Sequence, residues 1–240
     1  AHDIGWNYLQ STLPNSIILN YGDNDTFPLW NNQEVYGVRP DVRIMNTSYL
    51  GGEWYIDEMK TKANDAPGVP FSLPKHKYTF NNDMIYVTNS IDRPVEIKEV
   101  IDFVRSDIKL SDGTMTDYIP TKRIALPVNK ENALASGIVA EKDRDKMVDT
   151  VFINIKKNSL DKNQLMILDM LANFDWKRPI YMTQVYILQD FGLMDYLQFD
   201  GYAYRLVPIL TPTQNPYEIG RIDADYAAPL LRDTFRYGNL

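Results

Sequence analysis

The sequence predicts an α/β fold with a mixed, largely parallel sheet built from βαβ units, arranged as a Rossmann-like sandwich. A short apolar run at 16–21 is followed by a helical pattern and a second apolar run at 42–47. A similar alternation of strand and helix recurs at 151–183. Strand, helix and strand within about thirty residues imply parallel pairing through a right-handed crossover.

Length and composition describe an ordinary folded protein. The chain has 240 residues, of which 44% are hydrophobic and 24% charged, and such a chain buries a sizeable core. We expect one domain over residues 1–240, with residues 61–150 as an irregular insertion. No run approaches the ~20 apolar residues of a membrane-spanning helix. The start at Ala1 rather than at a methionine indicates a trimmed or mature chain.

Charge and the rare residue types exclude several classes of function. A formal net charge of −7 argues against nucleic acid as a partner, because phosphate binding needs a basic surface. The lack of cysteine removes thiolate zinc sites and cysteine nucleophiles, and two histidines disfavour a Ser-His-Asp triad or a multi-histidine metal centre. Thirty-two acidic residues offer too many candidates for an acid/base pair, so no catalytic residue is assigned.

The first unit carries its own start and stop signals. Asp25 or Thr26 is expected to cap a helix that holds Pro28 in its first turn and ends at Gly37. The apolar run before it is bounded by turn residues, as a buried strand is. In order, we expect a helix at 3–11, a strand at 16–21, the capped helix, and a strand at 42–47.

The rest of the chain continues the alternation less regularly. Strands are expected at 84–89, 123–128 and 199–210, and helices at 94–105 and 130–136. The second unit, a strand at 151–156, a helix at 164–172 and a strand at 179–183, is expected in the same sheet as the first.

Asp23, Asn24, Asp25 and Thr26 follow the first strand and raise two alternatives. Ligands bind outside the carboxyl ends of strands in open α/β sheets, and an Asp-x-Asp pair there can bridge a divalent metal to a diphosphate. The structural alternative is a turn and helix cap, for which Asp and Asn are preferred residues. Both alternatives stay open on the sequence alone.

Trp176 and Arg178, just before the strand at 179–183, raise a similar choice. An aromatic ring beside an Arg fork suits a sugar or phosphate site. Alternatively, Trp176 packs the connection between helix and strand, and Arg178 pairs with an acid such as Asp23 or Asp175.

Tyr204 and Arg205 are further candidate ligand contacts. Strand alternation places on one face Tyr202, Tyr204 and Leu206, and on the other Ala203, Arg205 and Val207. Sixteen tyrosines and four tryptophans suit carbohydrate or peptide binding, and they suit an ordinary core and interface equally well.

Three long segments carry a resemblance to a known family. They read NYGDNDTFPLWNNQEVYGVRPDVRIMNTSYL, NQLMILDMLANFDWKRPIYMT and LMDYLQFDGYAYRLVPI, and DTFRYGN near the end extends the similarity over most of the chain. The chain resembles the soluble C-terminal domain of large Bacteroidetes membrane proteins, formerly a domain of unknown function. The N-terminal half of those proteins spans the membrane many times and resembles protein O-mannosyltransferases.

The resemblance implies an accessory domain. In such glycosyltransferases the donor is a lipid-phosphate-linked sugar, and the catalytic carboxylate lies in a loop of the N-terminal half, which this sequence does not contain. It therefore implies no catalytic residue and no cofactor here. It implies a location at the periplasmic face of the inner membrane, with the transmembrane region of the same protein as a partner, and an acceptor protein or glycan as a ligand.

Two other functions remain as hypotheses. The first is a metal-dependent sugar-nucleotide transferase or phosphohydrolase that uses Asp23 and Asp25 with a divalent metal. The second is an interaction module that binds acceptor proteins through exposed Tyr and Trp side chains.

Overall fold

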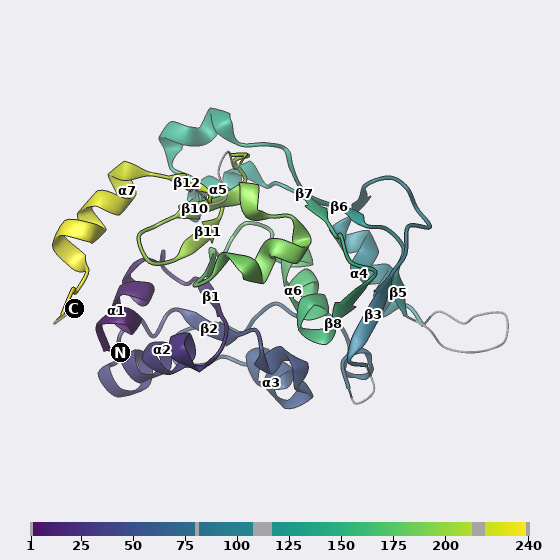
Figure 1. The fold of residues 1–240 in the computed structure, drawn as a ribbon, viewed down its shortest axis with the longest axis horizontal. Helices are drawn as coiled ribbons and strands as arrows, with labels where there is room; N and C mark the ends of the chain where they lie inside the picture. The colour runs from purple at the N-terminus through teal and green to yellow at the C-terminus, as the bar shows by residue number, and fades with distance from the viewer. Residues whose placement is uncertain (1, 80–81, 108–116, 213–218, 239–240) are drawn as a thin grey trace.

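The computed structural model describes residues 2–79, 82–107, 117–212 and 219–238 (Figure 1). Its helices are α1 (His2–Gln10), α2 (Asp23–Tyr36), α3 (Glu53–Met59), α4 (Ile97–Arg105), α5 (Lys130–Ala135), α6 (Lys162–Ala172) and α7 (Ala224–Pro229). Its strands are β1 (Ile17–Asn20), β2 (Arg43–Asn46), β3 (Met84–Val87), β4 (Val95–Glu96), β5 (Tyr118–Ile119), β6 (Arg123–Pro127), β7 (Thr150–Asn154), β8 (Ser159–Asp161), β9 (Ile180–Met182), β10 (Leu197–Phe199), β11 (Tyr204–Leu206) and β12 (Arg221–Ile222). This mixture confirms the predicted α/β class.

The central sheet has six strands in the order β12-β10-β11-β9-β1-β2. β1 runs parallel to both of its neighbours, with Ile18 opposite Ile44 of β2 and Tyr181 of β9. β11 pairs antiparallel with β9 and with β10. The βαβ unit predicted at the start of the chain, formed by β1, α2 and β2, is confirmed.

β1 is buried on both faces and so marks the middle layer of the fold. Ile17 and Leu19 belong to a large core that includes side chains of α3 and α6. Ile18 belongs to a smaller core with Leu9 of α1 and Leu29 of α2. Helices therefore cover both faces of the sheet, and α1 and α2 lie side by side on one of them (Figure 1).

The prediction that a second βαβ unit joins the same sheet is wrong. β7 pairs antiparallel with β6 in a separate sheet of order β4-β6-β7, whereas β9 lies beside β1. The predicted strand at 199–210 is shorter in the structure: β10 ends at Phe199, Gly201 at φ 100° lies in a turn, and only β11 (Tyr204–Leu206) falls wholly within the predicted range. Apolar alternation shows which face of a strand is buried, and it does not show which strand is the neighbour.

Residues 61–150 contribute β3 to β6 together with α4 and α5. With β7 and β8, which begin at or after the end of this region, these strands form two three-stranded sheets, in the orders β5-β3-β8 and β4-β6-β7. α4 turns one apolar face toward them, formed by Ile97, Val100, Ile101 and Val104. These side chains belong to the same buried cluster as β1 and α6, so the large core continues from the central sheet into this region.

Candidate functional site

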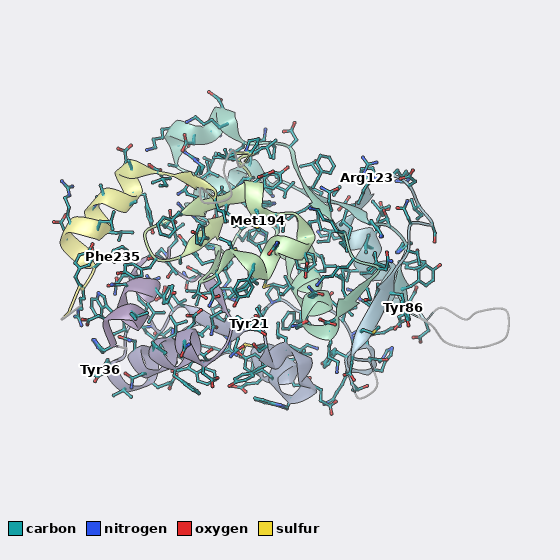
Figure 2. The ribbon with its side chains drawn as sticks, viewed as in Figure 1. Tyr21, Tyr36, Tyr86, Arg123, Met194 and Phe235 are labelled. Atoms are coloured by element: carbon teal, nitrogen blue, oxygen red, sulfur yellow. The ribbon has the colours of Figure 1, made fainter. Side chains whose placement is uncertain are left out.

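The loop after β1 lies where the central sheet changes its order of connection. β1 leads through α2 to β2 on one side, and β9 flanks it on the other. Asp23 and Asn24 are exposed at the carboxyl ends of these parallel strands, the usual ligand position in open α/β sheets. Tyr21, labelled in Figure 2, precedes them, and its ring lies 5.6 Å from the ring of Tyr186.

The side-chain cap predicted for this loop is wrong. α2 begins at Asp23, and its N-cap is Gly22 at φ 75°, with no side-chain hydrogen bond to the first turn. Glycine adopts this positive φ at little cost, so the helix begins ahead of the residues that favour capping. Asp25 and Thr26 therefore lie inside the first turn and make other contacts.

Asp25 connects α2 to the segment after β9. Its Oδ2 atom accepts hydrogen bonds from Thr183 Oγ1 at 2.6 Å and from Gln184 Nε2 at 2.7 Å, and the residue is 8% exposed. Since these partners lie 158 and 159 residues away in the sequence, only the folded chain reveals the contact.

Thr26 makes the corresponding contact to β1 and β2. Its hydroxyl donates to the carbonyl of Gly22 at 2.7 Å and accepts from the side-chain amides of Asn20 and Asn46, the latter at 2.9 Å. Thr26 and both asparagines are fully buried. The four predicted loop residues are adjacent, but they divide into two pairs. Asp23 and Asn24 are exposed, whereas Asp25 and Thr26 are buried and hydrogen-bond to residues at or just after the ends of neighbouring strands.

The metal hypothesis gains no further ligands from the fold. Among residues 2–79, 82–107, 117–212 and 219–238, no group of three or more His, Asp or Glu side chains is placed to hold a metal ion. Asp25 already accepts two hydrogen bonds, which leaves Asp23 as the exposed carboxylate of the pair.

We expect Asp25→Asn to lower the free energy of unfolding by about 1–3 kcal/mol, because Oδ2 accepts both hydrogen bonds and a neutral amide oxygen accepts them more weakly than a carboxylate does. Asp23→Asn, at an exposed position, should change it by less than about 0.5 kcal/mol. Urea denaturation measures both. Calorimetric titration with Mg²⁺ and Mn²⁺ tests the metal hypothesis on the parent chain and on both folded variants. Saturable binding to the parent chain that Asp23→Asn abolishes would support a metal site.

Trp176 and Arg178 lie away from this loop. Arg178 precedes β9, which is parallel to β1, so it lies at the opposite end of the strands from Asp23. It donates to the carbonyls of Asn15 at 2.7 Å and Gly68 at 2.9 Å instead of to an acid, and burial beside Arg43 lowers its pKa to about 10. Trp176 is fully buried, which matches the packing alternative.

Tyr204 and Arg205 lie on β11. Arg205 is buried, with Nε 3.0 Å from Asp200 Oδ2 and Nη1 donating to the carbonyl of Gly137 at 2.9 Å. Tyr204 is half-buried, with its ring 4.9 Å from that of Phe199. The candidate residues outside the loop therefore do not converge on it.

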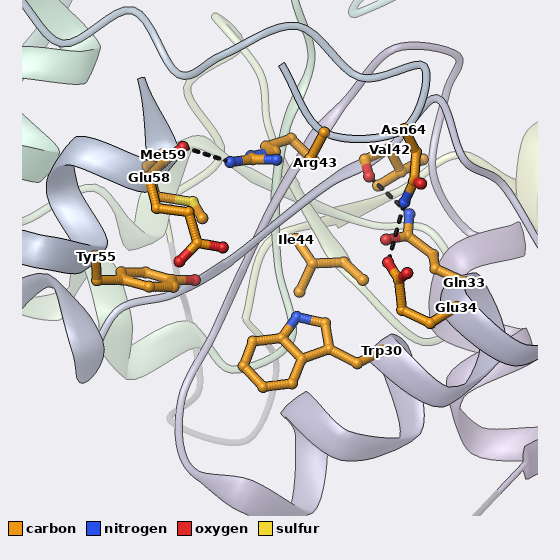
Figure 3. Close-up of a pocket in the computed structure, with 11 residues that line it drawn as sticks. Trp30, Gln33, Glu34, Val42, Arg43, Ile44, Tyr55, Glu58, Met59 and Asn64 are labelled. Atoms are coloured by element: carbon orange, nitrogen blue, oxygen red, sulfur yellow. Dashed lines mark hydrogen bonds between the residues drawn. The ribbon is translucent and has the colours of Figure 1, made fainter. Parts of the chain in front are cut away.

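A pocket of about 310 Å³, which no sequence pattern predicted, lies between α2, β2 and α3 (Figure 3). Its lining combines apolar and polar side chains: Trp30, Gln33, Glu34, Val42, Arg43, Ile44, Tyr55, Glu58, Met59, Ala63 and Asn64. One signal was present in the sequence. Trp30, Gln33 and Glu34 are three and four residues apart and so share one face of a helix.

Arg43 is the most deeply buried charge of this pocket, at 4% exposure. Nη2 donates to the carbonyl of Glu58 at 3.0 Å, while Nε has no partner among the described residues. Burial raises the pKa of Tyr55 to about 12, and its phenol oxygen accepts a hydrogen bond from the backbone amide of Asn46 at 2.8 Å. On the far side, Asn64 Nδ2 donates to Glu34 Oε1 at 3.0 Å.

A row of five aromatic rings borders the pocket, and we call it the aromatic ridge: Phe27, Trp30, Tyr49, Trp54 and Tyr55. Its rings come from α2, from a short 3₁₀ turn (Tyr49–Gly51) and from α3. Neighbouring ring centres along it lie 5.4–6.3 Å apart. Phe27 and Trp54 are 53% and 61% exposed, so the ridge offers large apolar groups to a partner.

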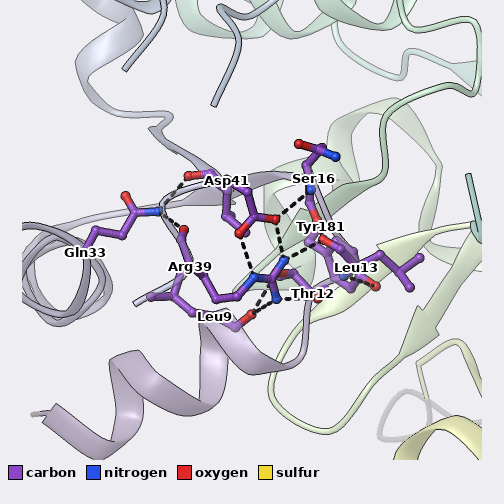
Figure 4. A network of polar contacts seen from close by, with 10 residues as sticks. Leu9, Thr12, Leu13, Ser16, Gln33, Arg39, Asp41 and Tyr181 are labelled. Atoms are coloured by element: carbon purple, nitrogen blue, oxygen red, sulfur yellow. Dashed lines mark hydrogen bonds and ion pairs between the residues drawn. The ribbon is translucent and has the colours of Figure 1, made fainter. Parts of the chain in front are cut away.

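A polar network fixes one wall of the pocket (Figure 4). Gln33 Nε2 donates to the carbonyls of Arg39 and Val42, both at 2.7 Å. The Arg39 guanidinium binds both carboxylate oxygens of Asp41, at 2.8 and 2.9 Å. Arg39 also donates to the carbonyl of Leu9 in the last turn of α1 and to those of Thr12 and Leu13, which follow the helix.

Hydrogen bonds from Arg39 lower the pKa of Asp41 below its usual 3.8. A lowered carboxyl pKa adds stability that is present above 3.8 and lost as pH falls through the folded-state value. We therefore expect Asp41→Asn to destabilise the protein at pH 7, with a difference from the parent chain that shrinks below pH 3.8. Urea denaturation between pH 7 and pH 3 measures this, and a difference that stays constant over that range would contradict it.

Comparison with protein families gives a match over most of the chain. A family model described as TMEM260-associated domain 2 matches residues 1–226. No curated protein and no solved structure matches the chain. Among the described residues, no helix is long and apolar enough to cross a membrane. Since the family model covers nearly the whole sequence, the chain belongs to the family of TMEM260-associated domain 2.

Proposed function

We propose that this chain is the accessory, non-catalytic domain of a TMEM260-type membrane protein that resembles protein O-mannosyltransferases, from the Bacteroidetes, and that it binds the acceptor protein or its glycan. Family membership supports the link to a membrane protein. The domain faces the periplasm in this proposal, with the transmembrane region of the same protein as its partner.

The aromatic ridge carries the proposal. Exposed Trp and Phe side chains that cluster on one surface are typical of interface centres, because they bury large areas at low cost in conformational entropy. In contrast, the polar candidates do not assemble an acid/base pair: Asp25 is bound to Thr183 and Gln184, and Arg205 is paired with Asp200. The surface is therefore better suited to binding than to turnover.

The test uses the complete membrane protein. Phe27→Ala combined with Trp54→Ala should raise KM for the acceptor protein about tenfold or more, because two exposed contacts are lost. Tyr86→Ala on β3 is the matched control, since Tyr86 is as exposed as Trp54, at 61%, and lies outside the ridge. Equal effects of the two changes, or sugar transfer by the isolated chain from a lipid-linked or nucleotide donor, would refute the proposal.

A further inference from the structure

We propose that the pocket between α2, β2 and α3 binds one neutral sugar ring, a hexopyranose unit of a glycan. The inference deepens the proposed function and rests on it for the biological role, while the binding itself is argued from the pocket alone. The argument uses the size of the pocket, the arrangement of its side chains, their free hydrogen-bonding groups and their charges.

The size restricts the ligand to a small ring. A volume of about 310 Å³ is at the lower end of the ~300–1,000 Å³ typical of small-molecule pockets. Val42, just before β2, and Ile44 place one wall along β2, one of the two edge strands of the central sheet. The carbonyl of Val42 and the backbone amide of Asn46 are already bonded to Gln33 and Tyr55, so a peptide cannot pair with this strand edge at those two groups.

The side chains surround the space with different chemistry on each side. Figure 3 shows Trp30 across the opening from Arg43, with Tyr55 and Glu58 on one flank and Glu34 on the other. A pyranose has an apolar C–H face and a rim of hydroxyl groups. The ring of Trp30 offers a surface for such a face, because its π cloud attracts polarised C–H bonds.

The lining of the pocket offers both donors and acceptors. Within the described parts of the chain, the Glu58 carboxylate has no hydrogen-bond partner, and Glu34 accepts only from Asn64. Deeper in the pocket, at two buried side chains, Arg43 Nε lacks a partner and the Tyr55 hydroxyl can donate a hydrogen bond. A sugar hydroxyl both donates and accepts, so it can satisfy either kind of group.

The charges favour a neutral ligand. Glu34 and Glu58 would repel a phosphate or a carboxylate, and the buried Arg43 would repel a cation. A neutral polyol still gains the stronger hydrogen bonds that ionised partners make. Planar charged side chains beside an aromatic ring therefore point to a sugar more than to an anion.

The test is calorimetric titration of the 240-residue chain with methyl glycosides of mannose, glucose and galactose. We expect saturable binding of at least one, with a Kd on the order of 1 mM. Glu58→Gln should weaken it about fivefold or more, because a charged acceptor becomes neutral. Glu53→Gln, on α3 but outside the pocket, should leave it unchanged. Both positions are accessible to solvent, so the variants should fold.

The outcomes separate this inference from the proposed function. No saturable glycoside binding, or equal binding by both variants, would overturn the sugar site even if the Phe27→Ala, Trp54→Ala protein loses acceptor affinity. Inorganic phosphate is titrated in parallel, and tighter binding of phosphate than of every glycoside would also overturn it. Glycoside binding that depends on Glu58, with normal acceptor KM in the ridge variant, would keep the site and refute the proposed function.

Discussion

Removal of the Arg205 side chain should lower the free energy of unfolding by about 3–5 kcal/mol, because it leaves the buried Asp200 carboxylate without its cation. Asp200 is fully buried, with Oδ2 3.0 Å from Arg205 Nε. The remaining partners, Tyr181 Oη at 3.0 Å and Gln198 Nε2 at 2.9 Å, are neutral and cannot replace the lost charge.

The loss should depend on pH. Burial raises the pKa of Asp200 above 3.8, and Arg205 opposes that rise. A carboxyl group whose folded-state pKa is raised costs stability as pH climbs above the unfolded value. Arg205→Ala removes the opposing charge, so the variant should be destabilised more at pH 7 than near pH 4.

Urea denaturation at both pH values measures this effect. Arg123→Ala is the control, because Arg123, labelled in Figure 2, is an exposed residue at the start of β6, and its loss should cost less than about 0.5 kcal/mol. Equal losses in the two variants, or a loss for Arg205→Ala that does not change with pH, would show that the ion pair contributes little.

The local elements of the fold could be predicted from the sequence, whereas their partners could not. The apolar runs of β1 and β2, separated by a helix that ends at Gly37, identified a parallel unit. The strand at 151–156 was also identified, but nothing in its pattern distinguishes a place beside β6 from a place beside β1. Such pairing depends on packing between segments far apart in the sequence.

The candidate site shows the same limit at the level of side chains. Asp23 and Asn24 were placed correctly at the carboxyl end of a strand, because that position follows from local order. The partners of Asp25, Arg178 and Arg205 were missed, since each lies more than 60 residues away or on another element. The pocket was missed because α2, β2 and α3 form it only after they pack.

Trp176→Ala should have an effect as large as that of Arg205→Ala, about 3–5 kcal/mol, because truncation of a buried aromatic residue leaves a cavity. The ring of Trp176 is fully buried, 4.7 Å from that of Phe174, and Nε1 donates to the carbonyl of Pro127 at 2.7 Å. Asp175 and Trp176 adopt φ of 47° and 56°, a costly conformation that persists only where surrounding contacts hold it.

Two further variants test whether packing explains this residue. Trp176→Phe keeps a ring but leaves the Pro127 carbonyl unpaired, so it should lose about 1–3 kcal/mol. Trp54→Ala, at a side chain 61% exposed, should lose less than about 0.5 kcal/mol. If urea denaturation gave Trp176→Ala no larger cost than Trp54→Ala, the core would not hold this ring, and Trp176 would again be a candidate ligand contact beside Arg178.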